Sequence, residues 1–176
     1  ALSTALFLNA SAQIYMGKTC EISFFSEAPI ENIEAINKSA QPVLNSATGD
    51  IQVRVPIKGF KFEKALMEEH FNENYMETEK YPTATFKGKI NEKVDYTKDG
   101  EYPVTATGIM KIHGVEKEKT INGTLTVKGS QVILNSKFNI AVAEYGIKVP
   151  SMYVKNIAET IETKISAVLE PYKSPK

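Results

Sequence analysis

Few side chains in this sequence are of the types that carry out catalysis or bind metal ions. The 176-residue chain has two histidines, His70 and His113, and one cysteine, Cys20. The histidines are far apart in sequence, and a lone cysteine forms neither an internal disulfide nor a multi-cysteine zinc site. No Gly-x-Ser-x-Gly elbow and no phosphate-binding loop is present. These features favour a non-catalytic protein without a metal or a cofactor, with a hydrolase as the less favoured alternative.

The sequence around each histidine favours a structural role over contact with a ligand. His113 precedes Gly114 between two apolar-polar alternating segments, which predicts a hairpin turn. A turn histidine most often hydrogen-bonds the backbone, so we expect a structural role for His113 rather than contact with a ligand. The same interpretation is favoured for His70, which lies in a segment of helical period.

Composition and charge narrow the class of protein further. Apolar residues make up 42% of the chain and charged residues 24%, with 21 basic and 21 acidic side chains. This is the composition of a globular domain, and an interleaved neutral charge pattern gives no basic face for nucleic acid. Beyond the first dozen residues, no apolar run approaches the roughly 20 residues that span a bilayer. We therefore expect one soluble domain that does not bind nucleic acid.

The first twelve residues have a different character. Residues 1–8 are apolar and uncharged, and Ala10-Ser11-Ala12 is a small-x-small triplet. This pattern is typical of the end of a secretory signal peptide, with cleavage between Ala12 and Gln13. An amphipathic N-terminal helix is the alternative. The signal interpretation predicts an exported, periplasmic or similar location and a mature domain spanning 13–176.

Period-two alternation of apolar and polar residues dominates the rest of the chain. It is clear over residues 51–58, 121–128, 132–140 and 161–169, and it predicts strands with one buried face. Predicted turns at 47–50, 98–100 and 128–130 contain glycine, and short reversals make neighbouring strands antiparallel.

Helical period is confined to two short segments. Residues 29–36 and 63–76 are the candidates, and in the second Leu66, Met67, His70, Phe71 and Tyr75 fall on one side. Together the patterns predict an all-β fold, a single antiparallel barrel of about eight strands with short helical caps that form a lid.

A barrel of this size is either filled by its own side chains or hollow enough for one ligand. Periodicity does not separate the two, but small inward residues at Ala84, Ala106, Gly108 and Ala167 favour a cavity. Candidate ligand-binding residues of the lumen and lid are Ile22, Phe24, Val53, Val55, Leu66, Met67, Phe71, Ala84, Phe86, Ala106, Met110, Ile112, Leu125, Leu134, Phe138 and Ile165. A ligand-free structural or interaction barrel stays open as an alternative.

Three segments carry a resemblance to a known family. They are residues 80–86 (Lys-Tyr-Pro-Thr-Ala-Thr-Phe), residues 108–117 (Gly-Ile-Met-Lys-Ile-His-Gly-Val-Glu-Lys) and residues 145–147 (Tyr-Gly-Ile). In this order they resemble the signature stretches of the YceI-like family of exported, lipocalin-like, polyisoprenoid-binding proteins, and residues 20–25 and 69–71 also fit. The resemblance spans residues 18 to 170. It implies an eight-stranded antiparallel barrel whose lumen holds a long-chain isoprenoid lipid, such as a quinone or a polyprenyl derivative.

The sequence departs from that family at two places. Many members carry an arginine shortly before the aromatic-Gly pair, where this chain has residues 139–144 without one, and an Asp-x-His-Leu-like element is replaced by residues 68–71. These differences bear on the head group of the ligand more than on its tail. A carrier of this kind is compatible with transient contact with a membrane and with a homodimer.

Overall fold

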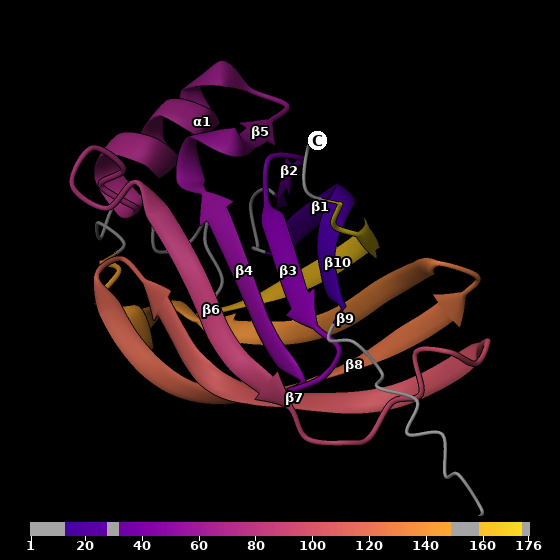
Figure 1. The fold of residues 1–176 in the computed structure, drawn as a ribbon. Helices are drawn as coiled ribbons and strands as arrows, with labels where there is room; N and C mark the ends of the chain where they lie inside the picture. Colours follow the sequence, from indigo (N-terminus) through magenta and orange to yellow (C-terminus); the bar gives the residue numbers. More distant parts are fainter. Residues whose placement is uncertain (1–12, 28–31, 149–158, 174–176) are drawn as a thin grey trace, which may run out of the picture.

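Antiparallel strands form most of the protein (Figure 1). The computed structural model describes residues 13–27, 32–148 and 159–173. The predicted signal peptide and its cleavage site at residue 12 lie outside these residues. The strands are β1 (Ile14–Ser26), β2 (Ile33–Asn37), β3 (Gln41–Asn45), β4 (Asp50–Pro56), β5 (Phe60–Phe62), β6 (Thr83–Ile90), β7 (Gly100–Ile112), β8 (Val115–Lys128), β9 (Gln131–Ala141) and β10 (Thr160–Pro171).

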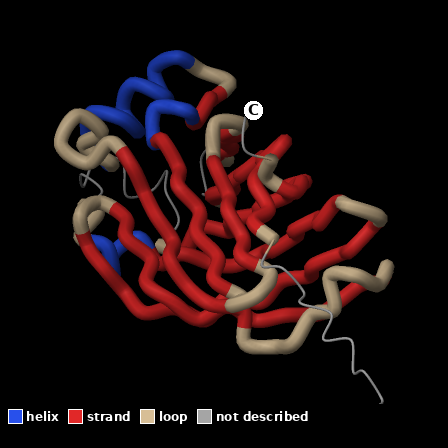
Figure 2. Tube along the Cα trace, in the orientation of Figure 1, coloured by secondary structure: helices blue, strands red, loops and turns tan. Residues whose placement is uncertain are grey.

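Among the described residues, four short helical segments connect these strands at their ends (Figure 2). They are the 3-10 turn η1 (Ile57–Gly59), the α-helix α1 (Ala65–His70), the π-helical turn η2 (Phe71–Tyr75) and the 3-10 turn η3 (Val142–Tyr145). Within the described residues, no helix is long and apolar enough to cross a membrane.

Eight of the strands close into a barrel. Their order is β1-β3-β4-β6-β7-β8-β9-β10, and β10 pairs back onto β1 from Tyr15↔Pro171 to Phe25↔Glu162. All neighbouring pairs are antiparallel, as short reversals require. The predicted all-β, eight-stranded antiparallel barrel with short helical caps is confirmed.

The two remaining strands, β2 and β5, extend the wall on one side. One edge of β1 pairs with β3 at its start and with β2 at its end, and β2 pairs in turn with β5. Because β3 and β2 follow one another along the same edge of β1, they form one strand of the wall with a break in it. In the same way, β4 pairs with β3 and β5 pairs with β2, so β4 and β5 form a second interrupted strand.

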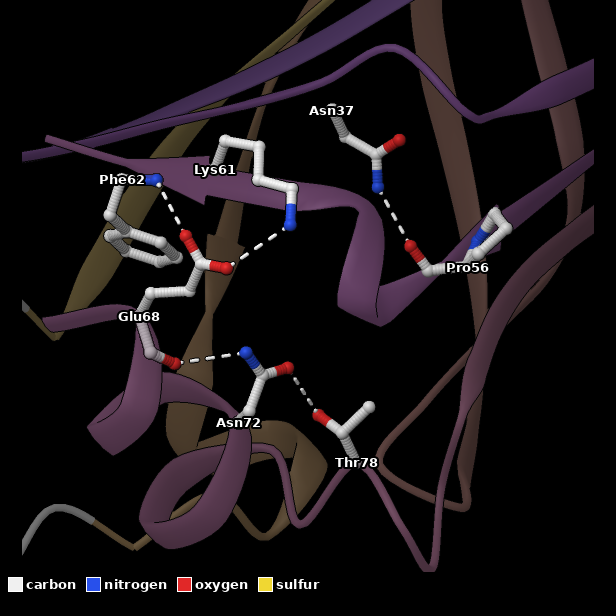
Figure 3. A network of polar contacts seen from close by, with 7 residues as sticks. All are labelled: Asn37, Pro56, Lys61, Phe62, Glu68, Asn72 and Thr78. Atoms are coloured by element: carbon white, nitrogen blue, oxygen red, sulfur yellow. Dashed lines mark hydrogen bonds and ion pairs between the residues drawn. The ribbon is translucent and has the colours of Figure 1, made fainter. Parts of the chain in front are cut away.

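A buried amide spans these two interruptions. Asn37 is fully buried, and its Nδ2 donates to the Pro56 carbonyl at 2.8 Å (Figure 3). Its Oδ1 accepts from the Ser39 N–H at 2.8 Å. A Cβ at position 59 would come within 2.8 Å of the same amide, so Gly59 leaves the room that Asn37 needs. The amide of Asn37 therefore satisfies one backbone carbonyl and one backbone N–H at the two breaks.

Two sequence predictions on local structure are wrong in part. Residues 33–36 form strand β2 instead of the predicted helix over 29–36, whose residues 28–31 lie outside the described chain. A five-residue segment with apolar residues at Ile33, Ala35 and Ile36 fits a strand as well as a helical face, and pairing with β1 and β5 decides for the strand. Gly100 begins β7 and does not turn the chain, because the reversal uses residues 91–99. The turns at Gly49 and Gly129 have positive φ, as predicted.

One end of the barrel is packed solid. Leu44, Leu125, Val132 and Leu169 are fully buried there, and the Tyr15 ring stacks on Tyr96 with centroids 5.7 Å apart. Cys20 is buried in the wall, and desolvation raises the pKa of its thiol to about 11, which disfavours the reactive thiolate form. The opposite end carries α1 and β5, which lie together beyond the end of β4 (Figure 1).

Candidate ligand cavity

A cavity of about 200 Å³ runs from the middle of the barrel to its helical end. Its lining residues come from seven of the eight barrel strands, all but β3, and from β5 and the helical segments, and the great majority are aliphatic or aromatic. Among the described residues, none that lines it is acidic, basic, histidine or cysteine. The interior therefore offers dispersion contacts and almost no electrostatic ones.

Four phenylalanines gather where the lid meets the barrel. Phe71 of η2 lies with its ring centroid 4.9 Å from that of Phe62, 5.5 Å from that of Phe24 and 5.7 Å from that of Phe60. Three of them, Phe24, Phe60 and Phe71, also line the cavity. Edge-on and tilted ring pairs of this kind contribute about 0.5–1.5 kcal/mol each beyond their buried area. The lid thus covers part of the cavity with an aromatic cluster.

Polar contacts fasten the lid to the wall from outside. The Glu68 carboxylate of α1 contacts Lys61 Nζ at 3.2 Å and accepts from the Phe62 N–H at 3.4 Å (Figure 3). Asn72 Nδ2 donates to the Glu68 carbonyl at 2.9 Å, and its Oδ1 accepts from the Thr78 hydroxyl at 2.9 Å. The predicted helix over 63–76 is present as α1 and η2, and it is anchored through β5.

Most of the residues predicted for the lumen and lid lie on this cavity. They are Ile22, Phe24, Val53, Val55, Phe71, Ala84, Phe86, Ala106, Met110, Ile112, Leu134, Phe138 and Ile165. Their contact with a ligand stays a prediction.

Three of the predicted residues do not line the cavity. The Leu66 side chain is 61% exposed on the outer side of α1, and Met67 is half-buried without reaching the lumen. Leu125 faces inward but lies in the solid end of the barrel. Periodicity indicates which face a strand residue occupies and carries no information on its depth along the barrel axis.

The small inward residues have two different roles. Ala84 and Ala106 line the cavity, whereas Gly108 and Ala167 do not. A Cβ on Gly108 would overlap the Lys87 carbonyl and the Gly88 Cα on β6, so this glycine allows two strands to approach closely.

Sequence reasoning left out several lining residues. Ile90, Ile121, Ile140 and Ile161 continue the alternation of their strands, which is a signal that could have identified them. Ile57, Phe60, Met76, Val142 and Ile147 come from turns or irregular segments, where no period applies.

Neither histidine lines the cavity. His113 Nδ1 donates to the Tyr145 carbonyl at 3.0 Å, so the predicted structural role of this turn histidine is confirmed. Within the described residues there is no cluster of side chains that could hold a metal ion.

The geometry defines a lipocalin-like class of protein, a closed antiparallel barrel with one solid end and an apolar lumen beneath a helical lid. The sequence profile of the YceI-like domain matches residues 20–169, and the chain belongs to this family. The comparison with curated proteins finds no significant match.

Solved structures share the fold at low sequence identity. A polyisoprenoid-binding domain from Saccharophagus degradans, implicated in plant cell wall breakdown, is 12% identical with a TM-score of 0.77, covering 92% of this chain and 100% of that one. BcnA from Burkholderia cenocepacia is 20% identical (TM-score 0.69, covering 85% and 95%), and the YCEI protein of Campylobacter jejuni is 18% identical (TM-score 0.65, covering 84% and 90%).

Proposed function

We propose that this protein is a non-catalytic carrier that holds the chain of a long isoprenoid lipid, such as a quinone or polyprenyl derivative, in the barrel lumen. The observation that carries the proposal is the apolar cavity of about 200 Å³ under an aromatic lid. The printed description of the Saccharophagus degradans relative as polyisoprenoid-binding supports the choice of ligand class.

Water is a poor occupant of such a cavity. A buried water needs about 10–15 Å³ of space and two to four polar partners, so the space is ample, but a lining that is mostly aliphatic and aromatic offers few partners. A hydrocarbon chain has the opposite requirements. Burying one CH₂ group is worth about 0.8 kcal/mol relative to water, or roughly 4 kcal/mol for a five-carbon prenyl unit before ordering costs.

The same arithmetic favours reversible exchange with a membrane. Both the lumen and a bilayer interior are apolar, so transfer between them is close to neutral in hydrophobic free energy. A protein of this kind accepts and releases lipid instead of trapping it.

Catalysis and a ligand-free barrel are both less well supported. No general acid or base lines the cavity in the described part of the chain, which argues against a hydrolase. A ligand-free barrel would be filled by Phe24, Phe86 and Phe138, yet these rings border open space.

Lipid extraction tests the proposal directly. Protein produced in a host that makes isoprenoid quinones is purified without detergent, extracted into organic solvent and examined by mass spectrometry. We expect a non-covalent isoprenoid in the extract and uptake of added quinone by the delipidated protein. Repeated extracts without lipid, together with no uptake, would rule out the carrier function.

We further propose that the carrier is exported, on the basis of the pattern in residues 1–12. Expression of the full precursor in an exporting host should give a mature chain that begins at or near Gln13. Intact-mass analysis that finds Ala1 on the exported protein would contradict this.

A further inference from the structure

One hydroxyl in the lumen has no hydrogen-bond partner. Thr163 lies on β10, is 5% exposed and lines the cavity, and its Oγ1 is buried without a partner in the part of the chain that the structure describes. In the register it pairs with Phe24 of β1 and Phe138 of β9, both of which line the cavity. The hydroxyl therefore lies between two aromatic residues of the lumen wall, one of which, Phe24, belongs to the aromatic cluster under the lid.

This arrangement is unfavourable in the ligand-free barrel. Valine has nearly the same shape as threonine and suits a strand equally well, whereas a buried hydroxyl without a partner costs free energy. The hydroxyl becomes favourable only when something inside the lumen hydrogen-bonds to it.

The neighbouring strand shows which kind of partner is missing. Ser136 on β9, which also lines the cavity, donates its hydroxyl hydrogen to the Asn122 carbonyl at 2.6 Å, so that hydrogen is already used. Thr163 retains both a donor and acceptor lone pairs for a ligand. Since no cationic side chain of the described residues lines the cavity, a charged head group would be buried there without a counter-ion.

We propose that Thr163 anchors an uncharged oxygen of the ligand, a hydroxyl or a carbonyl group, inside the lumen. This inference rests on the proposed lipid-binding function and refines it. The preferred ligand is a prenyl chain with a neutral oxygen group that enters the barrel, and a phosphorylated prenyl chain is disfavoured.

A competition between chains of equal length tests this. Delipidated, folded protein is incubated with equal amounts of farnesol and of its deoxy analogue 2,6,10-trimethyldodeca-2,6,10-triene, which differ by one hydroxyl, and the bound ratio is read by mass spectrometry of the extract. The bound amount of each compound is corrected for its own partition from water into organic solvent. The wild-type protein should enrich farnesol by about two- to tenfold, the range that one net hydrogen bond provides. Thr163→Val should bring the ratio to about one, and Thr163→Ser should retain the enrichment.

Matched controls separate the effect of the Thr163 hydroxyl from the other effects of a threonine-to-valine substitution. Thr160→Val makes the same change at an exposed position of the same strand and should leave the ratio unchanged. Delipidated Thr163→Val should melt at a higher temperature than the wild-type protein, because the variant lacks the unpaired buried group. A lower melting temperature would mean that the hydroxyl is paired and would overturn the inference.

The remaining outcomes separate the two proposals. If the wild-type protein binds both chains with a ratio near one, or if Thr163→Val keeps the wild-type ratio, Thr163 is not an anchor and the carrier function stands. Farnesyl phosphate that competes as well as farnesol would contradict the neutral-head preference. If neither chain binds, the carrier function itself fails.

Discussion

The Glu77 carboxylate and the His113 imidazole meet at 2.5 Å, and they belong to the two non-glycine residues that have positive φ in the described chain, 46° and 54°. The second ring nitrogen of His113 donates to the Tyr145 carbonyl, and the Tyr81 ring packs edge-on at 4.7 Å. One imidazole therefore links the segment after η2, the β7–β8 turn and η3. Left-handed backbone costs such residues about 1–2 kcal/mol each, and these contacts offset it.

Removal of this ring should loosen the lid. His113→Ala loses the contacts with Glu77, Tyr145 and Tyr81, so we expect about 1–3 kcal/mol lower stability in urea unfolding and faster amide hydrogen exchange over residues 65–78. His113→Gly lacks the same contacts but accepts positive φ, and it should be less destabilised. Wild-type exchange rates in the lid of His113→Ala would show that the ring does not hold it.

Filling the lumen should displace lipid without unfolding the barrel. Ala106→Leu adds bulk on the cavity wall, where a filled core would lose about 1–3 kcal/mol but an open one has room. We expect near wild-type stability and less bound lipid, or shorter chains, in the solvent extract. Ala47→Leu, the same change in the exposed β3–β4 turn, should leave lipid content unaltered. Equal lipid content in both variants would contradict the proposed binding site.

The contact between β6 and β7 should not tolerate a side chain at Gly108. Gly108→Ala places a methyl group against the Lys87 carbonyl, and separating the strands to relieve it should cost about 3 kcal/mol. Gly100→Ala is the matched change, because its new Cβ would meet nothing closer than 3.6 Å. Chemical denaturation measures both. A Gly108→Ala midpoint equal to that of Gly100→Ala would contradict the close approach.

Acid should remove the contribution of Glu92 to stability. The N–H and hydroxyl of Thr105 donate to its carboxylate at 2.6 and 2.7 Å, which lowers the Glu92 pKa below its ordinary value of 4.5. Because the folded pKa is the lower one, the stabilisation is present above about pH 4.5 and is lost as the pH falls through the folded value.

Glu92→Gln should therefore be less stable than the wild-type protein at neutral pH, with a gap that narrows below about pH 4.5. Glu118→Gln, at an exposed site, is the control. Thermal melting of both proteins between roughly pH 3 and pH 7 measures this difference in stability. A difference that does not change with pH would contradict the stabilising role of the Glu92 carboxylate.

The walls of the barrel could be predicted from sequence because each strand has one solvent-exposed face and one buried face. The interruption at residues 57–59 could not, since Asn37 and Gly59 create it by packing across the wall. The lumen could be predicted as a face but not as a volume: Leu125 and Leu134 are cross-strand neighbours with the same apolar-polar alternation, yet only Leu134 lines the cavity while Leu125 is fully buried in the core.

Thr163 illustrates how a polar residue in a strand can be overlooked. It occupies an inward position between Ile161 and Ile165, in a series where the other inward residues are apolar. Threonine is common in strands because of its shape alone, so its presence there does not indicate a polar group in the lumen. The register with Phe24 and Phe138 is what places the hydroxyl in the lumen.

The seam between β1 and β10 has a consequence for how the protein folds. Strands β6 to β9 pair with sequence neighbours through short connections, whereas Tyr15 meets Pro171 only when distant parts of the chain come together. Loop-closure entropy makes such a long-range pairing slow, so we expect the seam to form after the central hairpins, and refolding probes on β1 should lag behind probes on β7 and β8. Until β10 docks, the lumen is a trough that is open along one side, so the cavity exists as an enclosed space only after the slowest pairing of the chain has formed.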